Sequence, residues 1–142
     1  MKSQSMGITV NEQPQYFNLA FETEGKPNWQ QKVGHEIRVG PYRFCAIPLK
    51  GCINVSEVTT GLKIDEISLN PLFMAMTATQ EDALVFFRYV IGPGLKGKIE
   101  SSKNFDELLV RMQEKTFERL GEMPRVSDVA KDLQDELTRK EI

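Results

Sequence analysis

The sequence predicts an α+β fold, an antiparallel β-meander of about four or five strands packed on one buried helix and followed by a C-terminal helical pair. Strand-like segments separated by glycine and proline turns occupy the first half of the chain, and one almost wholly apolar helical pattern follows them. Two charged amphipathic segments, 104–120 and 127–140, complete the chain. We expect one domain over residues 15–142, preceded by a flexible segment over residues 1–14.

Length and composition indicate an ordinary globular chain. It has 142 residues, of which 40% are hydrophobic and 27% charged, and its formal net charge is −2. A chain of this size buries roughly two thirds of its unfolded surface, so it can fold without a metal or a disulfide. A net charge so close to zero gives no general attraction to nucleic acids or acidic membranes.

Cysteine content and hydropathy predict a cytoplasmic location. The chain has two cysteines, Cys45 and Cys52, whereas a small secreted domain carries a larger even set. Its first residues lack the apolar core of a signal peptide, and the longest apolar run, "ALVFF", stops at Arg88. We therefore expect reduced thiols and no membrane partner.

The first strands are predicted from alternation. "GITV" is a candidate short strand, and "QYFNLAFE" places Phe17, Leu19 and Phe21 on one side, as a half-buried strand does. "EGKPN" supplies turn residues after it.

A β-meander is predicted from Glu36 to Ile67. "PLKG" closes a hairpin in which Ile47 lies opposite Cys52 and Ala46 faces Ile53. On that register one face, expected to be buried, carries Phe44, Ala46, Ile53 and Val55.

The next turn is a three-residue loop, 59–61, with Gly61 at the position that needs a left-handed conformation. Val58 then pairs with Leu62, and Glu57 lies across from Lys63 as an opposite-charge pair.

A buried helix is predicted over residues 79–91. Thr79 and Asp82 fit the capping-box pattern, and apolar residues recur at helical spacing after them. A strand over residues 84–91 is the alternative, because periodicity separates the two weakly on short apolar runs.

The stretch "GPGLKGKI", residues 92–99, matches the first seven positions of a phosphate-binding loop. The eighth position requires Ser or Thr, and here it is Ile99, which cannot ligate a metal. We therefore interpret the stretch as a stop, in which Gly92 caps the helix, Pro93 prevents its continuation and Gly94 turns the chain. Lys96 and Lys98 would then lie on an exposed loop and contact an acidic partner.

The C-terminal helices have their own start and stop signals. Asn104 caps the first and Gly121 ends it, while Ser127 caps the second. The narrow apolar stripe with Leu133 and Leu137 suits a partner or the seam of a homodimer.

Reactive residues do not converge in the sequence. His35 is the only histidine, no G-x-S-x-G surrounds a serine, and the cysteine spacing is not that of a zinc site. We interpret His35 as a turn histidine at a strand edge and expect no catalytic residue, cofactor or metal ion. A small enzyme built from Asp65, Glu66, Tyr42, Tyr89 or His35 remains an alternative.

The segment 26–63 is locally basic and contains aromatic side chains, a combination that grips single-stranded nucleic acid. The candidate contacts for this alternative function are Lys26, Trp29, Lys32, Arg38, Arg43, Lys50 and Lys63.

"VSEVTTGLKI" and "TQEDALVFF" together are similar to small strand–turn–strand–helix proteins of bacterial phages and mobile elements. The resemblance implies a bacterial accessory protein and no particular activity. The favoured hypothesis is a non-enzymatic interaction or regulatory protein that acts through surface contacts, with a protein partner or self-association. The alternatives are the nucleic-acid-binding accessory protein and the small enzyme.

Overall fold

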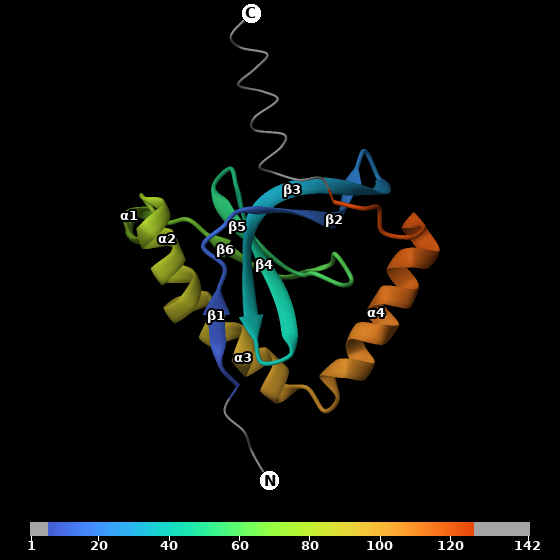
Figure 1. Cartoon of the computed structure of the whole chain (residues 1–142). Coiled ribbons are helices and arrows are strands. Elements are labelled where there is room, and N and C mark those ends of the chain that lie inside the picture. Colours follow the sequence, from blue (N-terminus) through green and yellow to red (C-terminus); the bar gives the residue numbers. More distant parts are fainter. Residues whose placement is uncertain (1–5, 127–142) are drawn as a thin grey trace, which may run out of the picture.

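The computed structural model, which describes residues 6–126, has an antiparallel six-stranded sheet with helices on two sides of it (Figure 1), and this confirms the α+β class. The strands are β1 (Ile8–Val10), β2 (Gln15–Thr23), β3 (Lys26–Val39), β4 (Tyr42–Leu49), β5 (Cys52–Glu57) and β6 (Lys63–Ser68). The helical segments are α1 (Pro71–Met76), α2 (Gln80–Phe86), the π-helical η1 (Phe87–Ile91), α3 (Gly92–Ser101) and α4 (Phe105–Leu120).

The long strand β3 organises the sheet. Its first part, 26–34, pairs with β2, and its last part, 35–39, pairs with β4, in a sheet of order β1-β3-β4-β5-β6. β1 pairs with residues 37–39 of β3, so the segment 1–14 contains the short strand suggested by "GITV". The β2–β3 turn is only Glu24-Gly25, both with positive φ, because Thr23 already pairs with Lys26.

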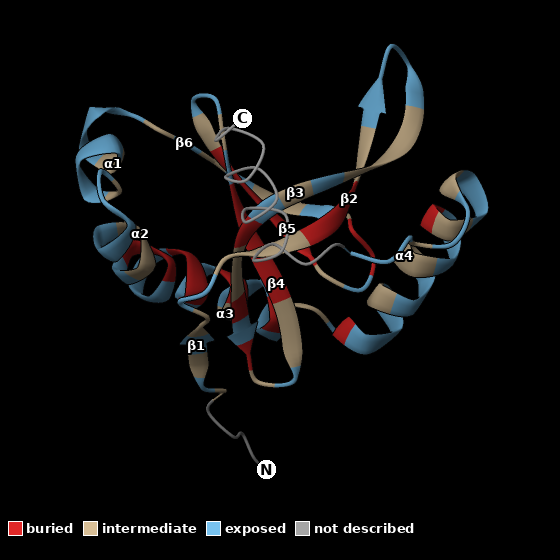
Figure 2. Cartoon of the chain, turned by 45° about the horizontal axis from the view of Figure 1, so that its top comes forward, coloured by how far each residue is buried: buried red, intermediate tan, exposed pale blue. Residues whose placement is uncertain are grey.

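β4 is buried on both of its faces. Phe44 and Ala46 enter a core shared with η1 and α3, whereas Cys45 and Ile47 enter a second core with Phe17 and Leu19 of β2. Figure 2 shows this buried strand in red at the centre of the molecule. The predicted alternation of Phe17, Leu19 and Phe21 is therefore confirmed, since Phe21 packs at the margin of the second core.

Gly34 permits the close approach of β3 to β4. A Cβ atom at this position would lie 2.3 Å from the carbonyl oxygen of Ala46 and 2.5 Å from Cδ1 of Ile47. Backbone cannot yield to such a contact as a flexible side chain can. Only glycine fits where β3 passes from its pairing with β2 to its pairing with β4.

The predicted register of the β4–β5 hairpin is wrong by two residues. Leu49, not Ile47, lies opposite Cys52, and Ala46 pairs with Val55 instead of Ile53. The turn is therefore the tight pair Lys50-Gly51, in which Gly51 has φ +79°. A slip of two residues leaves every side chain on its original face. The predicted buried face of Phe44, Ala46, Ile53 and Val55 is confirmed for that reason.

The predicted ion pair between Glu57 and Lys63 is also wrong. Glu57 is buried, and its carboxylate accepts hydrogen bonds from the backbone N–H groups of Thr59 (3.0 Å) and Thr60 (2.8 Å). Lys63 pairs with Ser56 across the strands, and its Nζ lies 3.4 Å from Glu66. These charge-assisted hydrogen bonds offset the burial of the carboxylate and shape the tip of the β5–β6 hairpin. Gly61 has φ +71°, as predicted for this tip.

Residues 80–101 form one helical run, so the interpretation of "GPGLKGKI" as a stop is wrong. Thr79 caps the run, as predicted, with its hydroxyl accepting the N–H of Asp82. Pro93 lacks an N–H and would clash with the carbonyl group four residues before it in a regular α-helix. The chain avoids this conflict by widening the preceding turn into η1, and Pro93 begins α3. Gly92 is buried against Ile8, whose Cγ2 would lie 2.7 Å from an added Cβ.

The penultimate predicted helix is confirmed as α4. The side chain of Asn104 accepts the N–H of Glu107, and Gly121 ends the helix with φ +82°. Phe105 and Thr116 of its apolar stripe are buried. The predicted helix 127–140, with Ser127, lies outside the described residues.

Two glycine substitutions test this description of the fold. We expect Gly97→Ala to raise the free energy of unfolding by about 0.5–1 kcal/mol, because Gly97 is inside α3 with open space where a Cβ would go. Gly34→Ala should lower it by about 1–3 kcal/mol through the contact with Ala46. Urea unfolding followed by circular dichroism measures both. A loss of stability in Gly97→Ala would contradict a helical "GPGLKGKI".

Candidate functional site

Six large apolar side chains are exposed on α1, α2 and η1, and four of them line one hollow. Figure 2 shows α1 and the outer side of α2 largely in the colour of exposed residues. We name this surface the apolar helical face, and its members are Leu72, Met74, Met76, Val85, Tyr89 and Val90. Leu72 and Tyr89 are the most accessible, with 65% and 67% of their surface exposed.

Helix α1 is a short helix with local signals at both ends. The side chain of Asn70 accepts the N–H of Phe73 at 2.7 Å, and Pro71 occupies the first turn. The hydroxyl of Thr77 donates to the carbonyl oxygen of Phe73 at 2.8 Å. α1 contains no buried residue, so these local bonds hold it in place with little help from a core.

One aromatic contact attaches α1 to the rest of the molecule. The ring of Phe73 meets the buried ring of Phe86 edge to face, with centroids 5.2 Å apart. Beside this contact lies a hollow of about 330 Å³, lined by Ala75, Met76, Asp82, Val85, Phe86, Tyr89 and Val90. Projecting side chains and a hollow therefore occur on the same face.

The π-helical turn contributes to this exposure. In η1, Phe87 and Ile91 are buried, while the three residues between them, Arg88, Tyr89 and Val90, are all exposed. A π-turn adds a residue to the helical turn, and such turns are frequent at functional sites. The guanidinium carbon of Arg88 lies 5.6 Å from the centroid of the Tyr89 ring.

Charged residues lie before and after Val85 along α2 and η1. Glu81 and Asp82 occupy the first turn of α2, where carboxylates interact favourably with the helix dipole. Arg88 lies about two turns further on. The exposed surface of α2 and η1 thus has an acidic end, an apolar middle at Val85 and a basic end.

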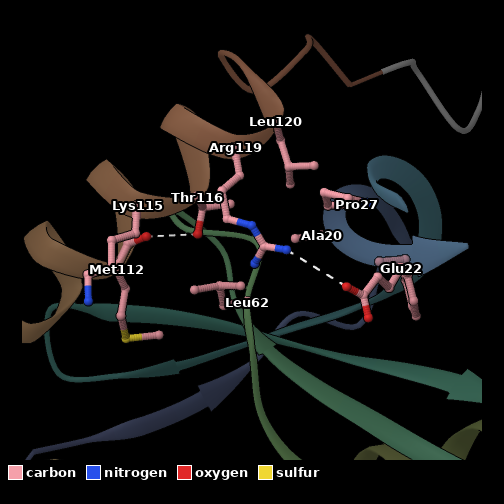
Figure 3. Close-up of a pocket in the computed structure, with 10 residues that line it drawn as sticks. Ala20, Glu22, Pro27, Leu62, Met112, Lys115, Thr116, Arg119 and Leu120 are labelled. Atoms are coloured by element: carbon pink, nitrogen blue, oxygen red, sulfur yellow. Dashed lines mark hydrogen bonds and ion pairs between the residues drawn. The ribbon is translucent and has the colours of Figure 1, made fainter. Parts of the chain in front are cut away.

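A second cavity lies between α4 and the sheet. This α4 groove has a volume of about 390 Å³, and its walls come from β2, β3, the β5–β6 hairpin and the C-terminal half of α4 (Figure 3). Arg119 lies 3.8 Å from Glu22 across it, and both side chains are 63% exposed. The hydroxyl of Thr116 is bonded within its own helix to the carbonyl oxygen of Met112, at 2.7 Å. The groove therefore offers apolar contacts and one exposed ion pair, without a converging reactive set.

The predicted nucleic-acid contacts are placed on different parts of the sheet. Only Arg38 and Arg43 are brought opposite each other, and both bind the carboxylate of Glu36. Lys26 and Lys32 lie on β3, Lys50 in the β4–β5 turn, and Lys63 at the start of β6.

Trp29 makes structural contacts within the fold. Its ring packs edge to face on Phe117, with centroids 5.8 Å apart, and its indole N–H donates to the carbonyl oxygen of Gly121 at 3.2 Å. This ring attaches the end of α4 to β3 and would need to leave that position to stack on a base.

His35 lies within β3 and not in a turn, which corrects that interpretation. Its Nδ1 is 2.9 Å from the carbonyl oxygen of Asn11, and because a carbonyl only accepts, Nδ1 carries the proton. Cys45 and Cys52 are both free thiols. Within residues 6–126, no group of three or more His, Cys, Asp or Glu side chains is arranged to hold a metal ion.

Of the predicted partner contacts, Lys96 and Lys98 lie on α3 instead of on a loop, and Leu133 and Leu137 lie outside the described residues. Sequence reasoning missed the apolar helical face altogether. "PLFMAM" has the composition of a core segment, and only the three-dimensional arrangement shows that Phe73 alone turns inward.

Comparison of the chain with protein-family models, with curated proteins and with solved structures found no match. Among residues 6–126, no helix combines the length and the apolar character needed to cross a membrane.

Burial raises the pKa of the Cys45 thiol from 9.0 to about 12. The folded state therefore holds this proton more tightly than the unfolded state. The contribution of the protonated Cys45 thiol to the free energy of unfolding is fully present below pH 9. It is lost as the pH rises from 9 towards 12. Burial also raises the pKa of Tyr42 to about 12, with a smaller contribution from its hydrogen bond to Asp106.

We expect the free energy of unfolding of the wild type to fall above pH 9 more steeply than that of Cys45→Ala, by up to about 1.4 kcal/mol per pH unit. Urea unfolding at pH 7, 9, 10 and 11 measures the two slopes. Parallel slopes for the two proteins would show that Cys45 does not hold its proton in the folded state.

Proposed function

We propose that this protein is a non-enzymatic interaction protein that binds another protein through the apolar helical face. The observation that carries the proposal is that four exposed large apolar side chains, Met76, Val85, Tyr89 and Val90, line one hollow, with Leu72 and Met74 also exposed on α1. Monomeric soluble proteins rarely expose a large contiguous apolar patch, and such patches mark sites of interaction.

The composition of the face supports a protein partner. Methionine, tyrosine and arginine are enriched in protein–protein interfaces, and here Met76 and Tyr89 line the same hollow, with Arg88 against the Tyr89 ring. Methionine side chains are unbranched and adapt to the shape of a partner. Glu81 and Arg88 flank Val85 along the helical run, and Asp82 lines the hollow beside it.

The internal packing gives these side chains no role in the monomer. Helix α1 is attached through Phe73, and α2 and η1 through Phe86, Phe87 and Ile91. Leaving Leu72 and Tyr89 in water forgoes roughly 1.5–3 kcal/mol for each side chain that could have been buried. Burial against a partner recovers this free energy.

A matched pair of substitutions tests the proposal. Val85 in the face and Val110 on α4 are both 53% exposed, so a glutamate disturbs the monomer equally little at either position. We expect the wild type and Val110→Glu, purified from the host and studied by native mass spectrometry, to carry a bound protein chain. Val85→Glu should lose at least about 90% of it, because a buried unpaired charge at an interface costs several kcal/mol.

Two results would contradict this function. The first is equal retention of the bound chain by Val85→Glu and Val110→Glu, which would place the binding surface elsewhere. The second is co-sedimentation of the wild type with neutral phosphatidylcholine vesicles, lost in Val85→Glu, which would assign the face to a lipid surface. Circular dichroism spectra of the two variants serve as the control for folding.

A further inference from the structure

We infer that the occupant of the apolar helical face is a second copy of this chain, packed antiparallel along α2 and η1 with a two-fold axis near Val85. This inference rests on the proposed function and specifies its partner. It follows from the order of charged and apolar residues along one exposed stripe.

The stripe is self-complementary in charge. Glu81 and Val85 are spaced i and i+4 on one side of α2, Arg88 follows three residues later in η1, and all three are exposed. Val85 is four residues from Glu81 and three from Arg88, which places it near the midpoint. A second helix running in the opposite direction and centred on Val85 therefore brings Arg88 of each copy to Glu81 of the other.

The neighbouring positions repeat the same symmetry. Asp82 and Tyr89 lie three residues before and four residues after Val85, and both are exposed. The same two-fold axis places Tyr89 of one copy beside Glu81 and Asp82 of the other, where its hydroxyl can donate a hydrogen bond to a carboxylate. One axis at Val85 brings each of these pairs to within one residue, about 1.5 Å of helix rise, of directly opposite positions, while the valines meet at the centre.

The shape of the face agrees with this arrangement. In a two-fold interface the same surface serves both partners, so it must contain both projections and depressions. Val85 and Tyr89 are exposed at the hollow of about 330 Å³, so a projection and a depression occur together. A stable interface buries about 800 Å² on each partner. Six large apolar side chains from each copy, with a charged rim, provide an apolar centre for such an interface.

Net charge does not oppose the association. The chain has a formal net charge of −2, so two copies repel each other weakly at pH 7. The two ion pairs at the rim fix the antiparallel direction, because a parallel pairing centred on Val85 would place like charges opposite each other.

Charge reversal and mixing test this inference on the full chain. Sedimentation equilibrium should show a wild-type dimer, and Glu81→Arg and Arg88→Glu should each raise the dissociation constant by at least about tenfold, because each places two like-charge pairs in its own homodimer. An equimolar mixture of the two variants should form a heterodimer with a dissociation constant within about threefold of the wild type. In that heterodimer, position 81 of each copy again meets a residue of opposite charge at position 88 of the other. The double variant E81R/R88E should dimerise equally well.

The controls separate this inference from the proposed function. Val110→Glu and the double variant L133D/L137D should dimerise like the wild type. Dissociation by L133D/L137D, with no effect of Glu81→Arg or Arg88→Glu, would overturn the inference by moving the seam to the C-terminal segment. A monomeric wild type at 1 mM concentration (about the highest attainable) would overturn it as well. Native mass spectrometry could instead show that the wild type binds a different protein and that Val85→Glu does not. In that case the proposed function would survive with another partner, and the inference of self-association would be wrong.

Discussion

The burial of β4 on both faces is the constraint on which the rest of this structure depends. One face requires the β2–β3 hairpin as a cover, and the other requires η1 and α3. Both covers are possible only because Gly34 lets β3 pass close to the backbone at Ala46 while it changes partners from β2 to β4. The helical run 80–101 is consequently held by its inner side alone, with Phe87, Ile91 and Leu95 against the sheet. Its outer side exposes Val85, Tyr89 and Val90.

This division of the helical run connects the fold to the proposed function. Pro93 imposes a widened turn, and that turn exposes three consecutive residues, Arg88 to Val90, next to a short capped helix that is attached by Phe73. The apolar side chains that result cost solubility and give the isolated chain no packing free energy. Their order between an acidic and a basic end provides the direction in which a second helix can pack. Under a two-fold axis, the acidic end of such a surface meets the basic end of a second copy. The surface is therefore suited to recognising a copy of itself.

Local signals in the sequence predicted local structure well. The alternation at Phe17 and Leu19, the left-handed Gly61 and the caps at Thr79 and Asn104 each depend on a few neighbouring residues, and all are present. Features set by distant contacts were not predicted. The β4–β5 register depends on a two-residue turn and shifted without changing the buried face, so the apolar pattern could not detect the error. Glycine at position 92 indicated a stop, but it is required by the contact with Ile8 of β1. The apolar helical face was missed because exposure, unlike composition, is a property of the folded chain.

The central claim is that two copies of the chain meet at Val85, and a disulfide at that position tests it most directly. A two-fold axis near position 85 brings the two Cβ atoms of a Val85→Cys variant within the roughly 4 Å that a disulfide requires. Air oxidation of this variant should give a cross-linked dimer as the main product on denaturing, non-reducing gel electrophoresis, whereas Val110→Cys and the wild type with its free Cys45 and Cys52 should migrate largely as chains without a cross-link. Equal cross-linking of Val85→Cys and Val110→Cys, or none of Val85→Cys, would contradict the account.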